Sequence, residues 1–209
     1  MEWLTRLIFP ARCPGCGQSV PSHGDWCSTC YGKVWHPRLL DGSHGTLSGC
    51  YCLTEYRGPM RRLLQQLKYH RALKYEAACH YLLARFPWPD VLHADWAVPV
   101  PLSPERYEKR GYNQTEVIFR PWIESYAGWY DCLQRVRTTE AQWHLSRSER
   151  AANLHKAFSL QYGRPVRGKK VLLLDDIYTT GATLEACAKT LKKAGAVKVT
   201  GLVMASGGR

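Results

Sequence analysis

Two adjacent acidic residues lie between an apolar run and a short turn rich in hydroxyl groups and glycine. The apolar run covers residues 171–174, the acids are Asp175 and Asp176, and the turn covers residues 179–183. The apolar positions that follow, at the spacing of an amphipathic helix, are Leu184, Cys187, Ala188 and Leu191. A strand, turn and helix in this order present backbone N–H groups at a helix N-terminus, where a phosphate can bind. Because open α/β sheets bind ligands at the carboxyl ends of their strands, we predict a phosphate cradle beside a pair of carboxylates.

An ordinary strand-turn-helix unit is the alternative explanation of this segment. In such a unit Thr179 or Thr180 would only cap the helix. Helix capping accounts for the threonines and the glycine, but it does not account for two adjacent acids at a strand end. Their mutual repulsion must be offset by a cation or by hydrogen bonds, so the pattern favours ligand binding.

Four cysteines near the N-terminus have the spacing of a metal site. They form two Cys-x-x-Cys pairs, which are Cys13, Cys16, Cys27 and Cys30. Each pair aims two sulfur atoms at one point, and two pairs complete a tetrahedron around zinc. A segment this short cannot build a sufficient core alone, so the metal would supply folding energy. Disulfides and free thiols are the alternatives, and disulfides are disfavoured in a cytosolic chain. We therefore predict one structural zinc ion.

The remaining cysteines are predicted to be core residues. Cys50 and Cys52 lie on alternate positions of a run with β-favouring residues, so both thiols could share one face of a strand. Metal binding by this pair is an alternative, but burial as small hydrophobic residues is expected. The same expectation applies to Cys79, Cys132 and Cys187.

A basic segment follows the apolar run at residues 96–100, which two prolines bring to an end. The residues of interest in this segment are Pro101, Leu102, Ser103, Arg106 and Arg110. Arginines in a loop at the carboxyl end of a strand suit a diphosphate. A solvated connection with helix-capping arginines explains the same residues equally well.

The chain is expected to contain two parts. Residues 1–49 would form a zinc-ribbon-like module followed by a turn-rich linker at 41–49. Residues 50–209 would form an α/β domain. We expect strands near residues 50–57 and 96–100, and the expected helices cover residues 60–69, 74–86 and 114–126.

The bulk composition points to anionic partners. The 209-residue chain carries 29 Lys and Arg against 17 Asp and Glu, a formal net charge of +12. A domain this basic tends to bind nucleic acid, phosphorylated substrates or anionic lipid, although a solvated basic surface would have the same composition. No apolar run in the sequence approaches the roughly 18 residues of a membrane span. The first residues lack the features of a signal peptide, so a cytoplasmic location is expected.

The segment with the acid pair resembles the ribose-phosphate signature of type I phosphoribosyltransferases. In that family the acids hold the ribose hydroxyls of phosphoribosyl pyrophosphate (PRPP), which the resemblance assigns to Asp175 and Asp176. The turn would wrap the 5-phosphate, and its matching residues are Thr179, Thr180, Gly181, Ala182 and Thr183. The resemblance also implies a pyrophosphate loop at Pro101, Leu102 and Ser103. Arg106, with Arg110, would bind the pyrophosphate that a Mg²⁺ ion accompanies.

Taken together, the motifs resemble the ComF family, the competence protein F group that includes GntX-like proteins. Further marks of this resemblance are the helix end at Leu67-Lys68-Tyr69, the segment from Arg110 to Gln114, and Gln142, Arg150, Asn153 and Phe158. The family implies a parallel sheet of the phosphoribosyltransferase type with helices on both faces and a small N-terminal zinc-ribbon module. Several relatives carry further Cys-x-x-Cys pairs, whereas this chain has four fitting cysteines.

The resemblance implies a role in natural transformation and leaves three functions open. The first is an accessory protein for uptake of single-stranded DNA that keeps a site for PRPP or another nucleotide phosphate. The second is a genuine phosphoribosyltransferase acting on a nucleobase or related acceptor, although no residues can be assigned to the acceptor. The third is a zinc-dependent adaptor for a helicase or a membrane channel, with a vestigial PRPP site. Such a role would also allow a place at the inner face of the membrane.

Overall fold

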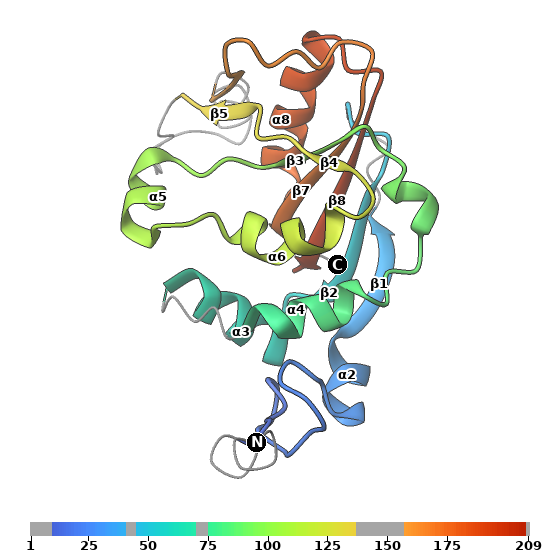
Figure 1. Cartoon of the computed structure of the whole chain (residues 1–209), viewed down its shortest axis with the longest axis vertical. Helices are drawn as coiled ribbons and strands as arrows, with labels where there is room; N and C mark the ends of the chain where they lie inside the picture. The colour runs from blue at the N-terminus through green and yellow to red at the C-terminus, as the bar shows by residue number, and fades with distance from the viewer. Residues whose placement is uncertain (1–9, 41–44, 70–74, 137–156, 208–209) are drawn as a thin grey trace.

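The computed structural model describes residues 10–40, 45–69, 75–136 and 157–207 (Figure 1). A six-stranded sheet forms the centre of the molecule. Its strands in spatial order are β1 (Trp35–Leu40), β2 (Cys50–Glu55), β8 (Lys198–Ser206), β7 (Lys170–Tyr178), β3 (Trp96–Pro99) and β4 (Gly128–Trp129). Neighbouring strands pair in parallel except β1, which runs antiparallel to β2 at the edge. The fold is therefore α/β with a mainly parallel sheet, as the sequence predicts.

Helices cover both faces of this sheet. One face holds α3 (Gly58–Tyr69), α4 (Glu76–Leu83) and α6 (Gln114–Ile123), and the other holds α8 (Ala182–Lys193). The remaining helices of the described residues are α2 (Ser28–Val34), α5 (Pro104–Arg110) and the short 3-10 helix η2 (Pro89–Leu92). A separate antiparallel ribbon pairs β5 (Leu133–Arg135) with β6 (Phe158–Leu160). Within the described ranges, no helix is long and apolar enough to cross a membrane.

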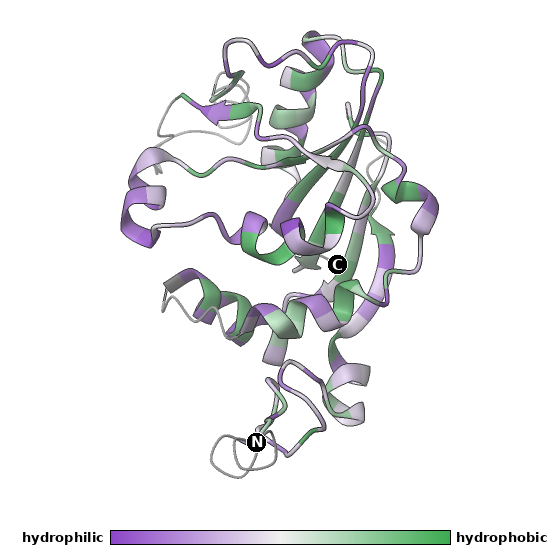
Figure 2. Ribbon diagram, viewed as in Figure 1, coloured by the Kyte–Doolittle hydropathy of each residue, from purple (hydrophilic) through white to green (hydrophobic). Residues whose placement is uncertain are grey.

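The side chains of β7 divide between two hydrophobic layers because successive residues of a strand point to opposite faces. Leu172 and Leu174 belong to the layer that holds α3, α4 and α6. Val171 and Leu173 belong to the layer that holds α8. In Figure 2 the central strands are coloured as hydrophobic, whereas the exposed α5 is mainly hydrophilic. Both faces of β7 are thus covered, which explains why its first residues form a continuous apolar run.

The predicted core cysteines are confirmed. Cys50 and Cys52 are fully buried on β2, in the same layer as α8. The thiol of Cys52 donates a hydrogen bond to the Thr54 carbonyl oxygen. The other three thiols predicted for the core, those of Cys79, Cys132 and Cys187, are also fully buried.

The N-terminal module is packed on the helices of the α/β domain. The indole N–H of the buried Trp26 donates a hydrogen bond of 2.9 Å to the Ala78 carbonyl on α4. The Arg62 guanidinium on α3 donates to the Gly15 carbonyl at 3.2 Å. In addition, β1 follows α2 directly and joins the main sheet. The sheet therefore includes residues on the N-terminal side of residue 49, and the predicted division into 1–49 and 50–209 stays a prediction.

Three predicted elements differ from the structure. The helix expected over residues 74–86 is shorter, since α4 spans only Glu76–Leu83. The helix expected to reach residue 126 ends at Ile123. The basic segment interpreted as a loop forms α5, which begins with a proline after Ser103 and carries Glu105 in its first turn. These residues are ordinary signals of a helix start.

Candidate functional site

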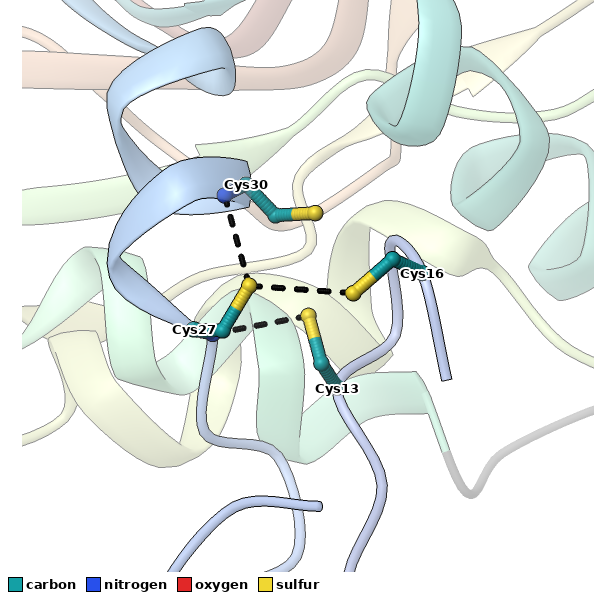
Figure 3. A group of neighbouring side chains, drawn as sticks. All are labelled: Cys13, Cys16, Cys27 and Cys30. Carbon is teal, nitrogen blue, oxygen red and sulfur yellow. Dashed lines mark hydrogen bonds between the residues drawn. The ribbon is translucent and has the colours of Figure 1, made fainter. Parts of the chain in front are cut away.

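The four N-terminal cysteines meet in one cluster (Figure 3). Their sulfur atoms all lie within 4.8 Å of one another, and the Sγ atoms of Cys16 and Cys27 are 3.7 Å apart. Tetrahedral zinc with Zn–S bonds of about 2.3 Å requires sulfur atoms about 3.8 Å apart, so the cluster fits the ion. It is the one group of three or more metal-ligating side chains that the described residues bring together. The predicted structural zinc site is therefore supported.

Backbone N–H groups favour the thiolate form of Cys13, whereas burial and the neighbouring thiols raise the pKa of Cys30 to about 12. The N–H groups of Gly15 and Cys27 both donate to the Cys13 sulfur at 3.4 Å, and Cys30 N–H donates to the Cys27 sulfur at 3.4 Å. Burial opposes ionisation of Cys13, but the N–H donors of Cys27, Cys16 and Gly15 lower its pKa to about 7. A thiol that ionises near neutral pH is ready to bind zinc, because the thiolate is the ligand.

The two acids lie inside β7 and not at its end, because the strand continues to Tyr178. The alternation of the strand places them on opposite faces. Burial and then the nearby Asp175 raise the pKa of Cys187 on α8. Burial and then Asp176 raise the pKa of Cys79 on α4. The two carboxylates thus belong to different layers, and the Asp176 N–H donates to Asp175 Oδ1 at 2.9 Å.

A lysine from the N-terminal half of the domain makes the environments of the two acids unequal. Lys68 Nζ on α3 lies 2.6 Å from Asp176 Oδ2, and the two side chains are only 18% and 11% exposed. Burial and the neighbouring Asp176 raise the pKa of Asp175. Asp176 is therefore paired with Lys68, while the raised pKa means that Asp175 retains a proton more readily. The pair combines a hydrogen-bond acceptor with a group able to donate, and both can bind hydroxyls.

The motif from Arg110 to Gln114 connects the end of α3 to the end of β3. The Tyr112 hydroxyl donates a hydrogen bond to the Leu67 carbonyl, one residue before Lys68. The Asn113 amide donates to the Val100 carbonyl at 3.1 Å and accepts from Thr115 N–H at the start of α6. These bonds hold α3 in the position from which Lys68 reaches Asp176.

The predicted phosphate turn directly precedes α8. Thr179 and Thr180 are exposed, and the Thr180 hydroxyl accepts a hydrogen bond of 3.4 Å from Ala182 N–H. Gly181 has φ +75° and caps the helix, where a Cβ atom would collide with the Tyr178 side chain. Only glycine adopts this conformation without strain at so close an approach. Ala182 and Thr183 form the first turn of the 12-residue helix, whose N-terminus favours an anion.

The structure brings the predicted pyrophosphate loop beside β7. Val100 N–H donates to the Leu174 carbonyl at 2.9 Å, so Pro101 and Leu102 follow next to the strand segment that contains the acids. Ser103 is buried at the start of α5.

The two arginines assigned to the pyrophosphate lie farther along α5. Arg110 is half-buried at the last position of the helix. Arg106 is exposed, and after burial its charge is the next cause that lowers the pKa of Arg135 on β5. Arg106 thus faces a second guanidinium, a grouping that suits an anionic ligand.

Lys68 is the site residue that sequence reasoning left without a role. In the sequence Lys68 follows Met60 and Leu64 at helical spacing, so it lies on the apolar face of the helix. A charge on such a face requires a buried partner, and this requirement is the local signal of its role. The family marks Gln142, Arg150 and Asn153 lie outside the described residues.

Loss of one zinc ligand tests the metal site. Cys27→Ser should reduce bound zinc from about one ion per chain to a small fraction, because three thiolates hold the ion less tightly than four. The melting temperature should fall as well, since the metal stabilises the segment that presents Trp26 to α4. Elemental analysis of purified protein measures the zinc. Cys50→Ala, a change in the sheet core, is the control and should keep its zinc; full zinc content in Cys27→Ser would contradict the assignment.

The ion pair between Lys68 and Asp176 predicts a pattern of stability changes. Lys68→Met should lower the free energy of unfolding by about 3 kcal/mol, because it leaves a buried carboxylate without its partner. Adding Asp176→Asn should restore most of that loss, and urea unfolding measures both. As a control, Lys189→Met breaks a more exposed pair with Glu185 (3.6 Å) and should cost less than about 1 kcal/mol. Equal losses of unfolding free energy in Lys68→Met and in the double variant would show that the ion pair with Asp176 does not account for the effect of Lys68.

Family models match both parts of the chain. The double zinc ribbon domain model matches residues 4–39, and the phosphoribosyl transferase domain model matches residues 136–208. These matches agree with the four-cysteine cluster and with the β7–turn–α8 segment.

Relatives with assigned names match most of the sequence. DNA utilization protein YhgH of Salmonella typhi is 32% identical over 220 residues, which cover 94% of this chain and 92% of the relative. Competence protein F of Haemophilus influenzae is 29% identical over 220 residues, covering 94% and 86% of the two chains. Competence protein ComFC of Streptococcus pneumoniae is 42% identical over 102 residues, covering 49% and 44%. This chain therefore belongs to the ComF family, with a zinc ribbon followed by a phosphoribosyltransferase domain.

Proposed function

We propose that this chain is an accessory protein for uptake of single-stranded DNA during natural transformation, with a binding site for PRPP or a related nucleotide phosphate. The observation that carries the ligand site is the β7–turn–α8 segment, in which the acid pair precedes an exposed threonine turn at a helix N-terminus. The names of the competence relatives support the cellular role. This role belongs in the cytoplasm, where a helicase or membrane channel would be its partner.

In the proposed complex each part of the ligand has its own protein groups. The 5-phosphate would bind the turn at Thr179 and Thr180 and the N–H groups at the start of α8. The ribose hydroxyls would bind the acids, with Asp176 as the acceptor that is paired with Lys68. The pyrophosphate would lie toward the loop at residues 101–103 and the arginines of α5. Mg²⁺, when bound with PRPP, would neutralise part of the pyrophosphate charge.

A second function, phosphoribosyl transfer, is favoured by the same acid pair. In this reaction the bond from the ribose anomeric carbon to pyrophosphate breaks, and the electron pair leaves with the pyrophosphate. The lone pair of an acceptor nitrogen forms the new bond, and the proton of that nitrogen passes to solvent. Asp176 would stabilise the positive charge that develops on the ribose, Asp175 would hold a ribose hydroxyl, and Arg106 would stabilise the leaving group. A zinc-dependent adaptor with a vestigial ligand site is the remaining alternative.

Complementation of a competent relative tests the proposed role. The chain is expressed in a Haemophilus influenzae strain that lacks its competence protein F, and transformation frequency is measured with marked DNA. The wild-type chain should restore transformation, and Asp175→Asn/Asp176→Asn should fail to restore it. Because this double variant leaves Lys68 without its partner, Thr179→Ala/Thr180→Ala at the exposed turn is measured as well and should also fail. The exposed Asp90→Asn is the control; full activity of both site variants would leave only the adaptor function.

Pyrophosphate release separates transfer from binding. Purified zinc-loaded protein is mixed with PRPP and Mg²⁺ across a panel of nucleobases, with a coupled assay for pyrophosphate. A transferase should show base-dependent release that falls about a hundredfold or more in Asp175→Asn/Asp176→Asn, since the charge stabilisation is lost. If calorimetry detects PRPP binding but no base causes pyrophosphate release, the site binds the ligand without transferring it. If the protein shows no PRPP binding and no pyrophosphate release, the PRPP assignment is overturned.

A further inference from the structure

A cavity of about 460 Å³ lies where the zinc module meets the sheet, outside the site described above. It is formed by the end of α2, the start of β1 and the connection from β2 to α3. Its principal lining residues are Lys33, Trp35, His36, Glu55, Arg57 and Gly58. A volume of this size is within the range of small-ligand sites.

The charge around this cavity is arranged for an anion. Lys33 and Arg57 are exposed cations on its rim, and Glu55, its lining acid, is ion-paired with Arg57. The N-terminus of the 12-residue helix α3 also opens here at Gly58, and its first turn contains no acidic residue. Instead, Arg61 and Arg62 occupy the beginning of the helix. Cations at the positive end of a helix dipole are unfavourable, and an anionic ligand would relieve that repulsion.

The cavity also presents an aromatic surface held in place by its neighbours. Trp35, half-buried at the start of β1, stacks on Tyr31 with ring centroids 5.6 Å apart and planes at 19°. Tyr31 in turn contacts the edge of Tyr81 on α4, with centroids 6.1 Å apart. An indole fixed in this way loses little freedom when a planar ring stacks on it. Cations beside a fixed indole match the chemistry of a base together with its phosphate.

The cavity lies at the carboxyl ends of the parallel strands, the same end of the sheet to which the acid pair is close. Glu55 of β2 pairs with Ser206 of β8, and Ser206 pairs with Tyr178 of β7. With about 4.8 Å between neighbouring strands, the cavity edge lies about 10 Å across the sheet from the end of β7. A nucleic-acid strand bound in the cavity would therefore pass beside the ribose-phosphate site without occupying it.

We propose that this cavity binds one nucleotide of a single-stranded nucleic acid, with the base stacked on Trp35 and the phosphate held by Lys33, Arg57 and the N-terminus of α3. The proposal goes beyond the proposed function because it does not require PRPP to bind. It assigns binding of a nucleic-acid strand to the surface where the zinc ribbon meets the phosphoribosyltransferase domain. The free mononucleotide has the same chemistry, so the experiment tests both sources.

Fluorescence anisotropy with a labelled thymidine oligonucleotide of about ten nucleotides is the direct test. Lys33→Gln/Arg57→Gln should weaken binding about tenfold or more near 0.1 M salt, and two lost phosphate contacts should reduce the salt slope by about 1.4. Trp35→Leu should weaken binding to this oligonucleotide but not to an abasic strand of the same length. The matched control is Lys193→Gln/Lys198→Gln, which removes two exposed charges at the opposite edge of the sheet and should leave the affinity within twofold of wild type.

The outcomes separate this proposal from the PRPP site. Asp175→Asn/Asp176→Asn should keep full oligonucleotide affinity, whatever happens to PRPP binding. Unchanged binding by Lys33→Gln/Arg57→Gln, with its zinc content and melting temperature preserved, would overturn the proposal. Binding of thymidine monophosphate without binding of the oligonucleotide would overturn the assignment to a strand and leave a free nucleotide as the ligand.

Discussion

The position of β7 between β8 and β3 is the constraint on which the rest of the structure depends. Parallel pairing on both sides buries its first residues against two layers of helices, and the alternation of the strand divides its side chains between them. The same alternation continues through the two acids, so each carboxylate enters a different layer. In the proposed complex one ligand would engage both acids because they are consecutive and lie close to the carboxyl end of the strand. The geometry thus links the burial of the core directly to the placement of charge.

Charge placed in this way needs compensation from a distance. Lys68 supplies it from α3, and α3 is held by Tyr112 at one end and by the zinc module through Arg62 at the other. Trp26 adds a contact from the same module to α4. The zinc site and the acid pair are therefore connected by one continuous set of packed helices.

The elements that could be predicted are those whose signal is local. The period of α8, the apolar run of β7 and the spacing of Cys13, Cys16, Cys27 and Cys30 are readable within a few residues. The partner of Asp176 could not be predicted, because it lies more than a hundred positions earlier in the chain. β1 was also missed, since a proline interrupts its residues and it becomes a strand only through pairing with β2. The start of α5 has a local signal in Ser103 and Pro104, although the arginines of the same segment also suit a diphosphate-binding loop.

The edge strand β1 gives the zinc ribbon a second structural task. β2 is almost entirely buried, and without β1 its row of backbone N–H and C=O groups would form an open, apolar edge. Such an edge can pair with another copy of the chain. β1 covers it and is itself a poor template, because Pro37 lacks an N–H donor, Arg38 adds a charge, and the register is irregular between Trp35 and Arg38. The ribbon segment thereby occupies the β2 edge that another chain could otherwise pair with, in addition to its place beside the metal site.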